Sequence, residues 1–269
     1  MNILFVGDIV GRPGRRCLAQ CLPRLREQYA LDFVIVNAEN AAGGLGIIPR
    51  VVDELLKMGV SGITMGNHTW RKREFVNTID KYRTVVRPAN YPMGVPGQGS
   101  AVVELPDGRA MGLVNVLGRV YLDSFDDPFT RAREEVERLR QSVPVVLVDF
   151  HAEATSEKVA LGWYLDGLAT AVVGTHTHVQ TSDERVLPKG TAYITDVGMT
   201  GPRDSVIGIE PPRAIQKFLT GIPSEFRVAK GPAILGAVVI QADDATGRAV
   251  SIERVSATVE AGVDDGDDE

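Results

Sequence analysis

Apolar, β-branched runs alternate with helical patterns through the first two thirds of the chain. The runs predict β-strands at residues 3–6, 33–37, 62–65, 145–149 and 171–173. Between them, apolar residues recur at the spacing of a helix face, which predicts helices at about residues 14–28, 49–58, 129–141 and 156–164. Pro13 and Pro49 stand where the first turn of a helix tolerates proline. Strand–helix alternation of this kind favours an α/β fold.

Two segments break this alternation and predict antiparallel strands. Residues 100–105 and 110–116 flank the turn sequence Pro106-Asp107-Gly108-Arg109, which is typical of a β-hairpin. Residues 225–258 are mostly strand-like, with Thr246-Gly247 as a turn. We therefore expect two sheets, one in which strands alternate with helices and one richer in antiparallel pairs.

The composition is that of an ordinary globular protein, with 44% hydrophobic and 24% charged residues. No apolar run approaches the roughly 20 residues that a membrane helix needs. Residues 1–8 carry no basic leader and predict a first strand rather than a signal peptide. We therefore expect a cytoplasmic protein that does not contact a membrane.

Charge changes the picture only at the end of the chain. The net charge is −6, but residues 261–269 hold five acids and no base, so the remainder has a net charge of −1. We expect a single domain over residues 1–260 and a disordered acidic tail at residues 261–269. The nearly neutral body lacks the basic surface that a protein binding duplex DNA needs, whereas a small anionic substrate is compatible with it.

Histidine is the strongest chemical signal. All four histidines follow runs that predict core strands: His68, His151, His176 and His178. Two more predicted strands end in acids or amides, in Gly7-Asp8 and in Asn37-Ala38-Glu39-Asn40. Because ligands gather at the carboxyl ends of strands in α/β sheets, we expect five strand ends to deliver these side chains to one crevice.

These residue types favour a metal centre. A lone acid at a strand end is more often a turn former, and a lone histidine is more often a core residue. His176 and His178 are harder to explain in that way, because residues i and i+2 of an extended segment point in the same direction. Imidazole with carboxylate, and without thiolate, suits Mn, Fe or Zn better than a soft metal or an iron–sulfur cluster.

The order of these motifs resembles the calcineurin-like metallophosphoesterase superfamily. In chain order the motifs are Gly7-Asp8, Glu39-Asn40, Gly66-Asn67-His68, His151 at the end of a predicted strand, and Gly174-Thr175-His176-Thr177-His178. The resemblance covers residues 1–180. Three longer runs make the chain similar to the bacterial 2′,3′-cyclic-nucleotide 2′-phosphodiesterase family over all but the acidic tail: Gly7-Asp8-Ile9-Val10-Gly11, Asn37-Ala38-Glu39-Asn40-Ala41-Ala42-Gly43-Gly44 and Ala192-Tyr193-Ile194-Thr195-Asp196-Val197-Gly198-Met199. The resemblance implies an α/β sandwich of two facing mixed β-sheets flanked by helices.

The resemblance also implies two divalent or trivalent transition-metal ions per chain, with Fe or Mn favoured and Zn as the alternative. Asp8 and His178 would hold the first ion, Glu39 would bridge both ions, and three residues would hold the second: Asn67, His151 and His176. The chain departs from the superfamily at Val10, where a histidine ligand is common, and at Glu39, which replaces an Asp. Asn40 could fill the vacancy through its amide oxygen; its alternative role is that of a turn former.

This metal core implies hydrolysis of phosphodiesters. Two cations about 3.5–4 Å apart can share a bridging hydroxide that attacks phosphorus in line. His68, which the metals do not need, would stabilise the phosphoryl oxygens or protonate the leaving group, or else orient the ligands. Substrates would be 2′,3′-cyclic nucleotides, related small nucleotides or RNA ends. The alternatives are a phosphomonoesterase or phosphoprotein phosphatase, and a regulatory protein that retains the site. The resemblance also suggests a homo-oligomer.

Weaker signals surround this core. Asp149 and Glu153 flank His151 and could orient the ligands. Trp70 could stack on a nucleobase, although core packing is the commoner use of tryptophan. Three arginines crowd the start of the first predicted helix, where the helix dipole disfavours cations, and we favour local salt bridges over an anionic substrate as their explanation: Arg12, Arg15 and Arg16.

Overall fold

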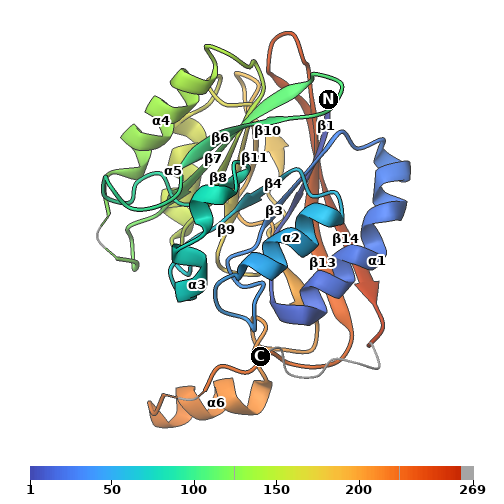
Figure 1. The fold of residues 1–269 in the computed structure, drawn as a ribbon, viewed down its shortest axis with the longest axis vertical. Helices are drawn as coiled ribbons and strands as arrows, with labels where there is room; N and C mark the ends of the chain where they lie inside the picture. The colour runs from blue at the N-terminus through green and yellow to red at the C-terminus, as the bar shows by residue number, and fades with distance from the viewer. Residues whose placement is uncertain (124, 224, 262–269) are drawn as a thin grey trace.

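The computed structural model describes residues 1–123, 125–223 and 225–261. Two mixed β-sheets face each other, and helices cover their outer faces (Figure 1). This arrangement confirms the predicted α/β sandwich. The predicted acidic tail lies outside the described residues from position 262 onward, so its disorder, like the single-domain boundary at residue 260, stays a prediction.

The first sheet has the order β2-β12-β13-β1-β3-β4-β5, and β14 pairs with β13. Its strands are β1 (Asn2–Val6), β2 (Asp8–Ile9), β3 (Phe33–Asn37), β4 (Gly62–Thr64), β5 (Val85–Val86), β12 (Met199–Pro202), β13 (Ala233–Ala242) and β14 (Ala249–Val259). Strands β1, β3, β4 and β5 run parallel, whereas β13 lies antiparallel to β1 and to β14. The carboxyl ends of the parallel strands therefore share one edge.

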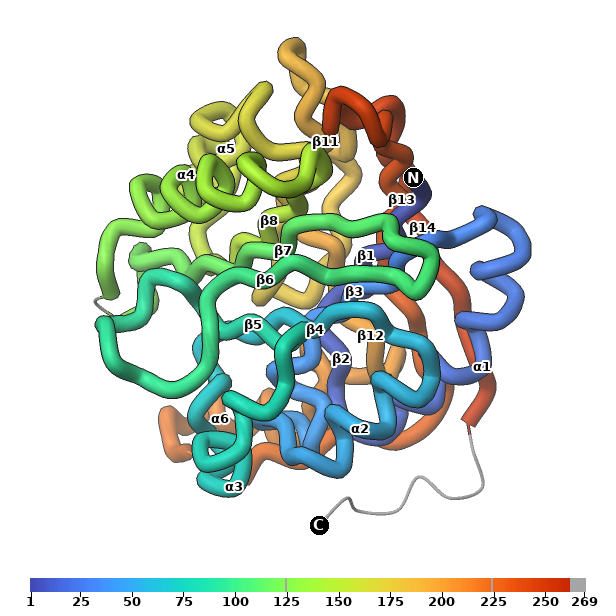
Figure 2. Tube along the Cα trace, turned by 45° about the horizontal axis from the view of Figure 1, so that its top comes forward, coloured from blue at the N-terminus to red at the C-terminus, as the bar shows by residue number. Residues whose placement is uncertain are grey.

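The second sheet has the order β10-β11-β9-β8-β7-β6. Its strands are β6 (Ser100–Glu104), β7 (Ala110–Leu117), β8 (Val146–His151), β9 (Ala171–Thr175), β10 (Arg185–Val186) and β11 (Ala192–Ile194). The hairpin β6–β7 and the parallel set β7, β8, β9 and β11 lie in this one sheet. Figure 2 shows it stacked on the first sheet.

The helices and the single 3₁₀ turn of the described chain are α1 (Gly11–Tyr29), α2 (Pro49–Lys57), α3 (Arg73–Val76), η1 (Ile79–Lys81), α4 (Pro128–Leu139), α5 (Thr155–Tyr164) and α6 (Pro211–Thr220). Helices α1 and α2 lie on the first sheet, and α4 and α5 lie on the second (Figure 1). Helix α6 projects away from both sheets (Figure 1). None of the helices in the described ranges is long and apolar enough to cross a membrane.

Alternation along the strands builds three apolar layers. Leu4 and Val6 of β1 pack toward α1 and α2, whereas Ile3 and Phe5 face the second sheet. Side chains of β8 divide in the same way, with Leu147 between the sheets and its neighbours under α4 and α5. Because successive side chains of a strand point to opposite faces, sheets covered on both sides need strands that are apolar throughout. This explains why the apolar runs predicted these strands.

The expectation that one sheet would hold the strands that alternate with helices, and the other the antiparallel pairs, is wrong. The hairpin over residues 100–117 and the antiparallel pair β13–β14 do form. Each of them, however, lies in the same sheet as parallel strands, because β7 also pairs with β8 and β13 also pairs with β1. Both sheets are therefore mixed. Residues 225–232, which were expected to belong to the last strand-rich segment, precede β13 and contain no strand among those described.

Candidate metal centre

The candidate ligands follow strands of both sheets at their common edge. Asp8 begins β2, which comes after β1, while Glu39 and Asn40 follow β3, and Asn67 follows β4. His151 ends β8, while His176 and His178 follow β9. The predicted convergence therefore occurs, but across two facing sheets rather than along a single row of strands.

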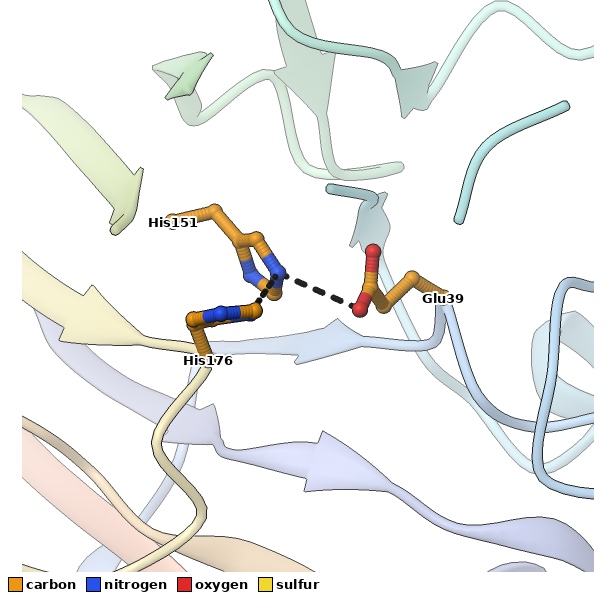
Figure 3. A group of neighbouring side chains, drawn as sticks. All are labelled: Glu39, His151 and His176. Atoms are coloured by element: carbon orange, nitrogen blue, oxygen red, sulfur yellow. Dashed lines mark hydrogen bonds and ion pairs between the residues drawn. The ribbon is translucent and has the colours of Figure 1, made fainter. Parts of the chain in front are cut away.

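The Nε2 atom of His151 lies at the centre of one group. It is 3.0 Å from Asn67 Oδ1, 3.0 Å from His176 Nδ1 and 3.1 Å from Glu39 Oε1. Figure 3 shows His151 between Glu39 and His176. One ligand atom from each of these three residues lies within 4.8 Å of the others, and Glu39 and His151 are buried. The group has the residue types and the size of a metal site.

In each of the three candidate histidine ligands, one ring nitrogen faces an acceptor, and this contact decides which of the two nitrogens carries the lone pair. His151 Nδ1 lies 2.9 Å from Thr175 Oγ1, whose own proton goes to Asp149 Oδ1 at 2.7 Å. His176 Nε2 lies 3.1 Å from Glu153 Oε2, and His178 Nδ1 lies 2.9 Å from the carbonyl oxygen of Ile207. Partners of this kind fix the tautomer of metal-binding histidines. The candidate ligand atoms are then Nε2 of His151, Nδ1 of His176 and Nε2 of His178.

This arrangement fits a cation. With those tautomers, lone pairs of two imidazoles, an amide oxygen and a carboxylate oxygen face one another within about a hydrogen-bond length and with no proton among them. Asp8 Oδ1 is buried and has no hydrogen-bond partner among the described residues. Buried acceptor atoms that face one another are costly unless a positive charge satisfies them. The donor set of imidazole, carboxylate and amide suits a transition metal.

The pKa values of these groups show the same demand for positive charge. Burial lowers the pKa of His151, but the carboxylates of Glu39, Asp8 and Asp149 outweigh it and raise the pKa to about 9. Burial raises the pKa of Asp8. Burial acts in the same direction on Glu39, but His151 and His68 hold the pKa of that carboxyl well below its usual value. A proton on His151 thus takes the place of a cation when no metal is bound.

Asp8, His178 and Asn40 form a looser second group. His178 Nε2 lies 3.7 Å from Asp8 Oδ1, and 3.3 Å from Asn40 Nδ2. Asn40 Nδ2 also donates to Glu39 Oε1 at 3.3 Å, so this carboxylate oxygen adjoins both groups. The Asn40 amide nitrogen, rather than its oxygen, faces His178 here. Ligation through Oδ1 requires the amide to turn over.

His68 lies against the same carboxylate. Its backbone N–H donates to Glu39 Oε2 at 2.8 Å, while its ring Nδ1 is 3.2 Å from Glu39 Oε1 and 2.6 Å from Asn40 Oδ1. The imidazole makes these contacts through Nδ1, which leaves Nε2 as the nitrogen that can meet a substrate. His68 therefore adjoins the candidate centre without entering the group around His151.

Sequence reasoning named Asp149 but missed the rest of a buried polar network beneath His151. Asp149 accepts hydrogen bonds from Thr175 at 2.7 Å, from Asn37 Nδ2 at 3.0 Å and from Thr64 Oγ1 at 2.5 Å. The predicted link between Asp149 and His151 therefore runs through Thr175. A polar residue in the middle of an apolar strand is the sequence signal that could have found this network. Ile207, which supplies only its carbonyl, left no such signal.

The structure confirms the weaker predictions for Arg15, one of the three clustered arginines, and for Trp70. Arg15 of α1 forms an ion pair with Glu54 of α2 at 3.1 Å, as the salt-bridge interpretation requires. Trp70 is half-buried against the core beneath α2, and its ring centroid lies 5.8 Å from that of Tyr91. Its surroundings are those of a packing residue.

Comparison with known proteins gives relatives that span almost the whole chain. The family of YmdB-like proteins matches residues 4–255. A 2′,3′-cyclic-nucleotide 2′-phosphodiesterase of Bacillus subtilis is 51% identical over 95% of this chain and 96% of its own. The crystal structure of a novel phosphatase from Mycoplasma pneumoniae has a TM-score of 0.90 at 37% identity, covering 98% of this chain and 95% of that one. A hypothetical protein from Thermus thermophilus has a TM-score of 0.87 at 44% identity, covering 97% of this chain and 100% of that one.

Proposed function

The chain belongs to the YmdB-like family, and on that basis we propose that it is a metal-dependent phosphodiesterase acting on 2′,3′-cyclic nucleotides or related small phosphodiesters. The name of the Bacillus subtilis relative, at 51% identity, supports the phosphodiester substrate. The observation that carries the proposal is the convergence of His151 Nε2, His176 Nδ1 and Glu39 Oε1 on one point. RNA ends, with the same ribose phosphate chemistry, are the alternative substrate.

The centre would hold two transition-metal ions. The first ion would be bound by Asp8, Asn40 and His178. The second would be bound by Asn67, His151 and His176, and Glu39 Oε1 would adjoin both. When bound, such ions would stabilise negative charge on the phosphoryl group and supply a nucleophile from water near neutral pH. Fe or Mn is favoured over Zn, because the first group has a single imidazole.

His68 would act on the substrate rather than on the metals. Glu39 holds its ring through Nδ1, so the imidazolium form of His68 would present its Nε2 proton to a phosphoryl oxygen or to the leaving oxygen. Opening of a 2′,3′-cyclic phosphate at the 2′ oxygen requires such a proton. The ring is partly exposed, with 21% of its side-chain surface accessible, so a substrate can reach it.

Metal reconstitution with matched substrates tests the proposal. Protein stripped by a chelator would be reloaded with Mn, Fe, Zn or Mg, and its turnover of 2′,3′-cyclic AMP, bis-p-nitrophenyl phosphate and p-nitrophenyl phosphate compared. We expect the stripped protein to be inactive and the Mn- or Fe-loaded protein to hydrolyse the diesters. Absence of diester hydrolysis with every metal would overturn the proposal.

A phosphomonoesterase is the second candidate, because the similar Mycoplasma pneumoniae structure is named a phosphatase. The same experiment separates the two, since a monoesterase would turn over p-nitrophenyl phosphate and spare both diesters. A regulatory protein would bind metal and turn over neither. The cytoplasmic location and the homo-oligomer stay predictions.

A further inference from the structure

Behind the metal centre lies a buried ion pair that the proposed chemistry does not use. Lys158 of α5 donates from Nζ to Asp196 Oδ2 at 2.7 Å, and the two side chains are 1% and 0% exposed. Asp196 follows β11, the strand next to β9. The pair therefore sits beside the strand from which His176 and His178 emerge.

Asp196 accepts hydrogen bonds from the segment between these histidines. Its Oδ2 accepts from the backbone N–H of Thr177 at 3.1 Å and from Thr177 Oγ1 at 2.7 Å. Its Oδ1 accepts from the N–H of Gly198 at 2.8 Å, in the segment that leads to β12. One carboxylate thus ties the Thr177 segment to the helix and to the neighbouring strand.

The backbone of this segment needs such support. His176 and His178 have φ angles of 98° and 66°, in the left-handed region that side chains other than glycine rarely adopt. Such residues persist only where the surroundings hold them, and they cluster at functional sites. In this conformation the segment directs His176 Nδ1 toward His151 Nε2 at 3.0 Å, and His178 Nε2 toward Asp8 Oδ1 at 3.7 Å.

Stability alone gives a weak reason for a buried ion pair. Desolvating two charges consumes most of their attraction, so apolar residues of the same volume often serve a fold equally well. A carboxylate is required here for another reason, because it accepts from three donors besides Lys158 at once. Lys158 supplies the charge that offsets this carboxylate where water is excluded.

We propose that Asp196 and Lys158 are positioning residues for the metal centre, which hold Thr177 so that both histidine ligands face their ions. The inference rests on the proposed metal assignment. It makes a specific claim, because His176 belongs to the group of the second ion and His178 to that of the first. A change at Asp196 should therefore weaken both ions together.

Three variants test this with Mn²⁺ as the probe: Asp196→Asn, Lys158→Met and the double variant. Titration of metal-free protein with Mn²⁺ should show both sites weakened roughly 10–100-fold in Asp196→Asn, the loss typical when a residue that orients ligands is removed. Either single variant leaves one buried charge unpaired and should lower Tm. The double variant should regain Tm because neither charge remains, yet keep the weak metal binding.

Asp166 provides a matched control. It is also a buried carboxylate beside the second sheet, and it accepts from the backbone N–H of Lys189 at 3.1 Å, but it contacts none of the candidate ligands. Asp166→Asn should lower Tm and leave Mn²⁺ affinity unchanged. If Asp166→Asn and Asp196→Asn weaken Mn²⁺ equally, or if the double variant regains both Tm and affinity, the role is merely structural and the inference is overturned.

Amide hydrogen exchange separates failure of this inference from failure of the proposed function. In metal-free wild-type protein the Thr177 N–H should be protected, and in Asp196→Asn it should exchange faster. Unchanged protection in the variant would overturn the inference. A wild-type protein that binds no Mn²⁺ but shows the expected exchange would instead overturn the metal assignment.

Discussion

His151 donates its Nδ1 proton to the hydroxyl of Thr175, 2.9 Å away. The direction is fixed because Thr175 gives its own proton to Asp149 at 2.7 Å, and a carboxylate only accepts. The lone pair of His151 is therefore held on Nε2, toward Asn67 and Glu39. A hydroxyl buried beneath the site thus decides which ring nitrogen can bind metal.

Thr175→Val tests this relationship, since it removes the hydroxyl and keeps the shape of the side chain. We expect roughly 10–100-fold weaker binding of the second ion and unchanged binding of the first, measured by Mn²⁺ titration. Thr170→Val is the control, because Thr170 is also buried and bonds only to backbone groups, of Val146 and Gly247, away from the centre. Equal losses in the two variants would contradict the orienting role.

The bridging role of Glu39 predicts the metal stoichiometry. Elemental analysis should find two ions per wild-type chain. Glu39→Ala should lose both ions, because Oε1 adjoins His151 on one side and Asn40 on the other. Asp8→Ala should mainly weaken the first. One ion per chain after full repletion would refute a binuclear centre.

His68→Ala should leave both ions in place and lower kcat by roughly 10²–10⁴-fold, the usual effect of removing a general acid. His151→Ala is the comparison, since it removes the atom at the centre of the second group and should lose metal. Steady-state kinetics with 2′,3′-cyclic AMP, paired with metal analysis, distinguishes the two. Metal loss in His68→Ala to the extent seen in His151→Ala would mean that His68 is a ligand.

Asn40→Ala should weaken the first ion selectively and spare the second, on Asn67, His151 and His176. The reason is that the variant lacks the amide oxygen, which in Asn40 would turn toward the ion and bind it. Metal titration checks it, and unchanged affinity would leave solvent as the ligand. Adding the superfamily histidine, by Val10→His, is a poorer test, because Val10 is fully buried against Gly208, where an added Cβ would lie 2.7 Å from its Cγ1, so the larger imidazole would displace its neighbours.

Stability of the metal-free protein should depend on pH through His151. Burial lowers its pKa, but Glu39, Asp8 and Asp149 raise it to about 9. A histidine with a raised pKa stabilises the fold fully below about pH 6.5, its unfolded value, and this contribution is lost as pH rises through about 9. Tm of chelator-treated protein should therefore fall between these values. The fall should be smaller in metal-loaded protein, where the ion replaces the proton, and an identical fall would contradict the assignment.

Buried parallel strands were the most predictable part of the fold. Strand β3 has the predicted bounds of residues 33–37, because a strand covered on both faces is a continuous apolar run. Sheet membership could not be predicted, since the partner of β7 depends on packing between distant segments. Helix α6 was missed, although Ile215, Phe218 and Leu219 recur at helical spacing; in the structure these side chains are exposed and do not form part of a core.

The candidate ligands were predictable because histidine is scarce and each one follows a strand. Asp149 and Glu153 were predicted to orient these ligands, but the contacts through which they do so could not be predicted. Asn37 and Asp149 lie on different sheets and meet at 3.0 Å only in three dimensions, and Ile207 acts through a backbone atom that every residue possesses. His176 binding through Nδ1 follows from the contact of its Nε2 with Glu153, which spacing cannot reveal.

The place of β1 in its sheet has a consequence for biosynthesis. This strand pairs with β3 on one side and with β13 on the other, and Met1 donates to Ala242, 241 residues further along the chain. While the ribosome is still making the middle of the protein, β1 therefore has an open edge, of the kind that recruits other strands. Strand β2, which follows β1, also lacks its partner until late in synthesis, because Asp8 of β2 pairs with Met199 of β12. Nascent chains that stall before β13 should thus need chaperones and should not retain metal.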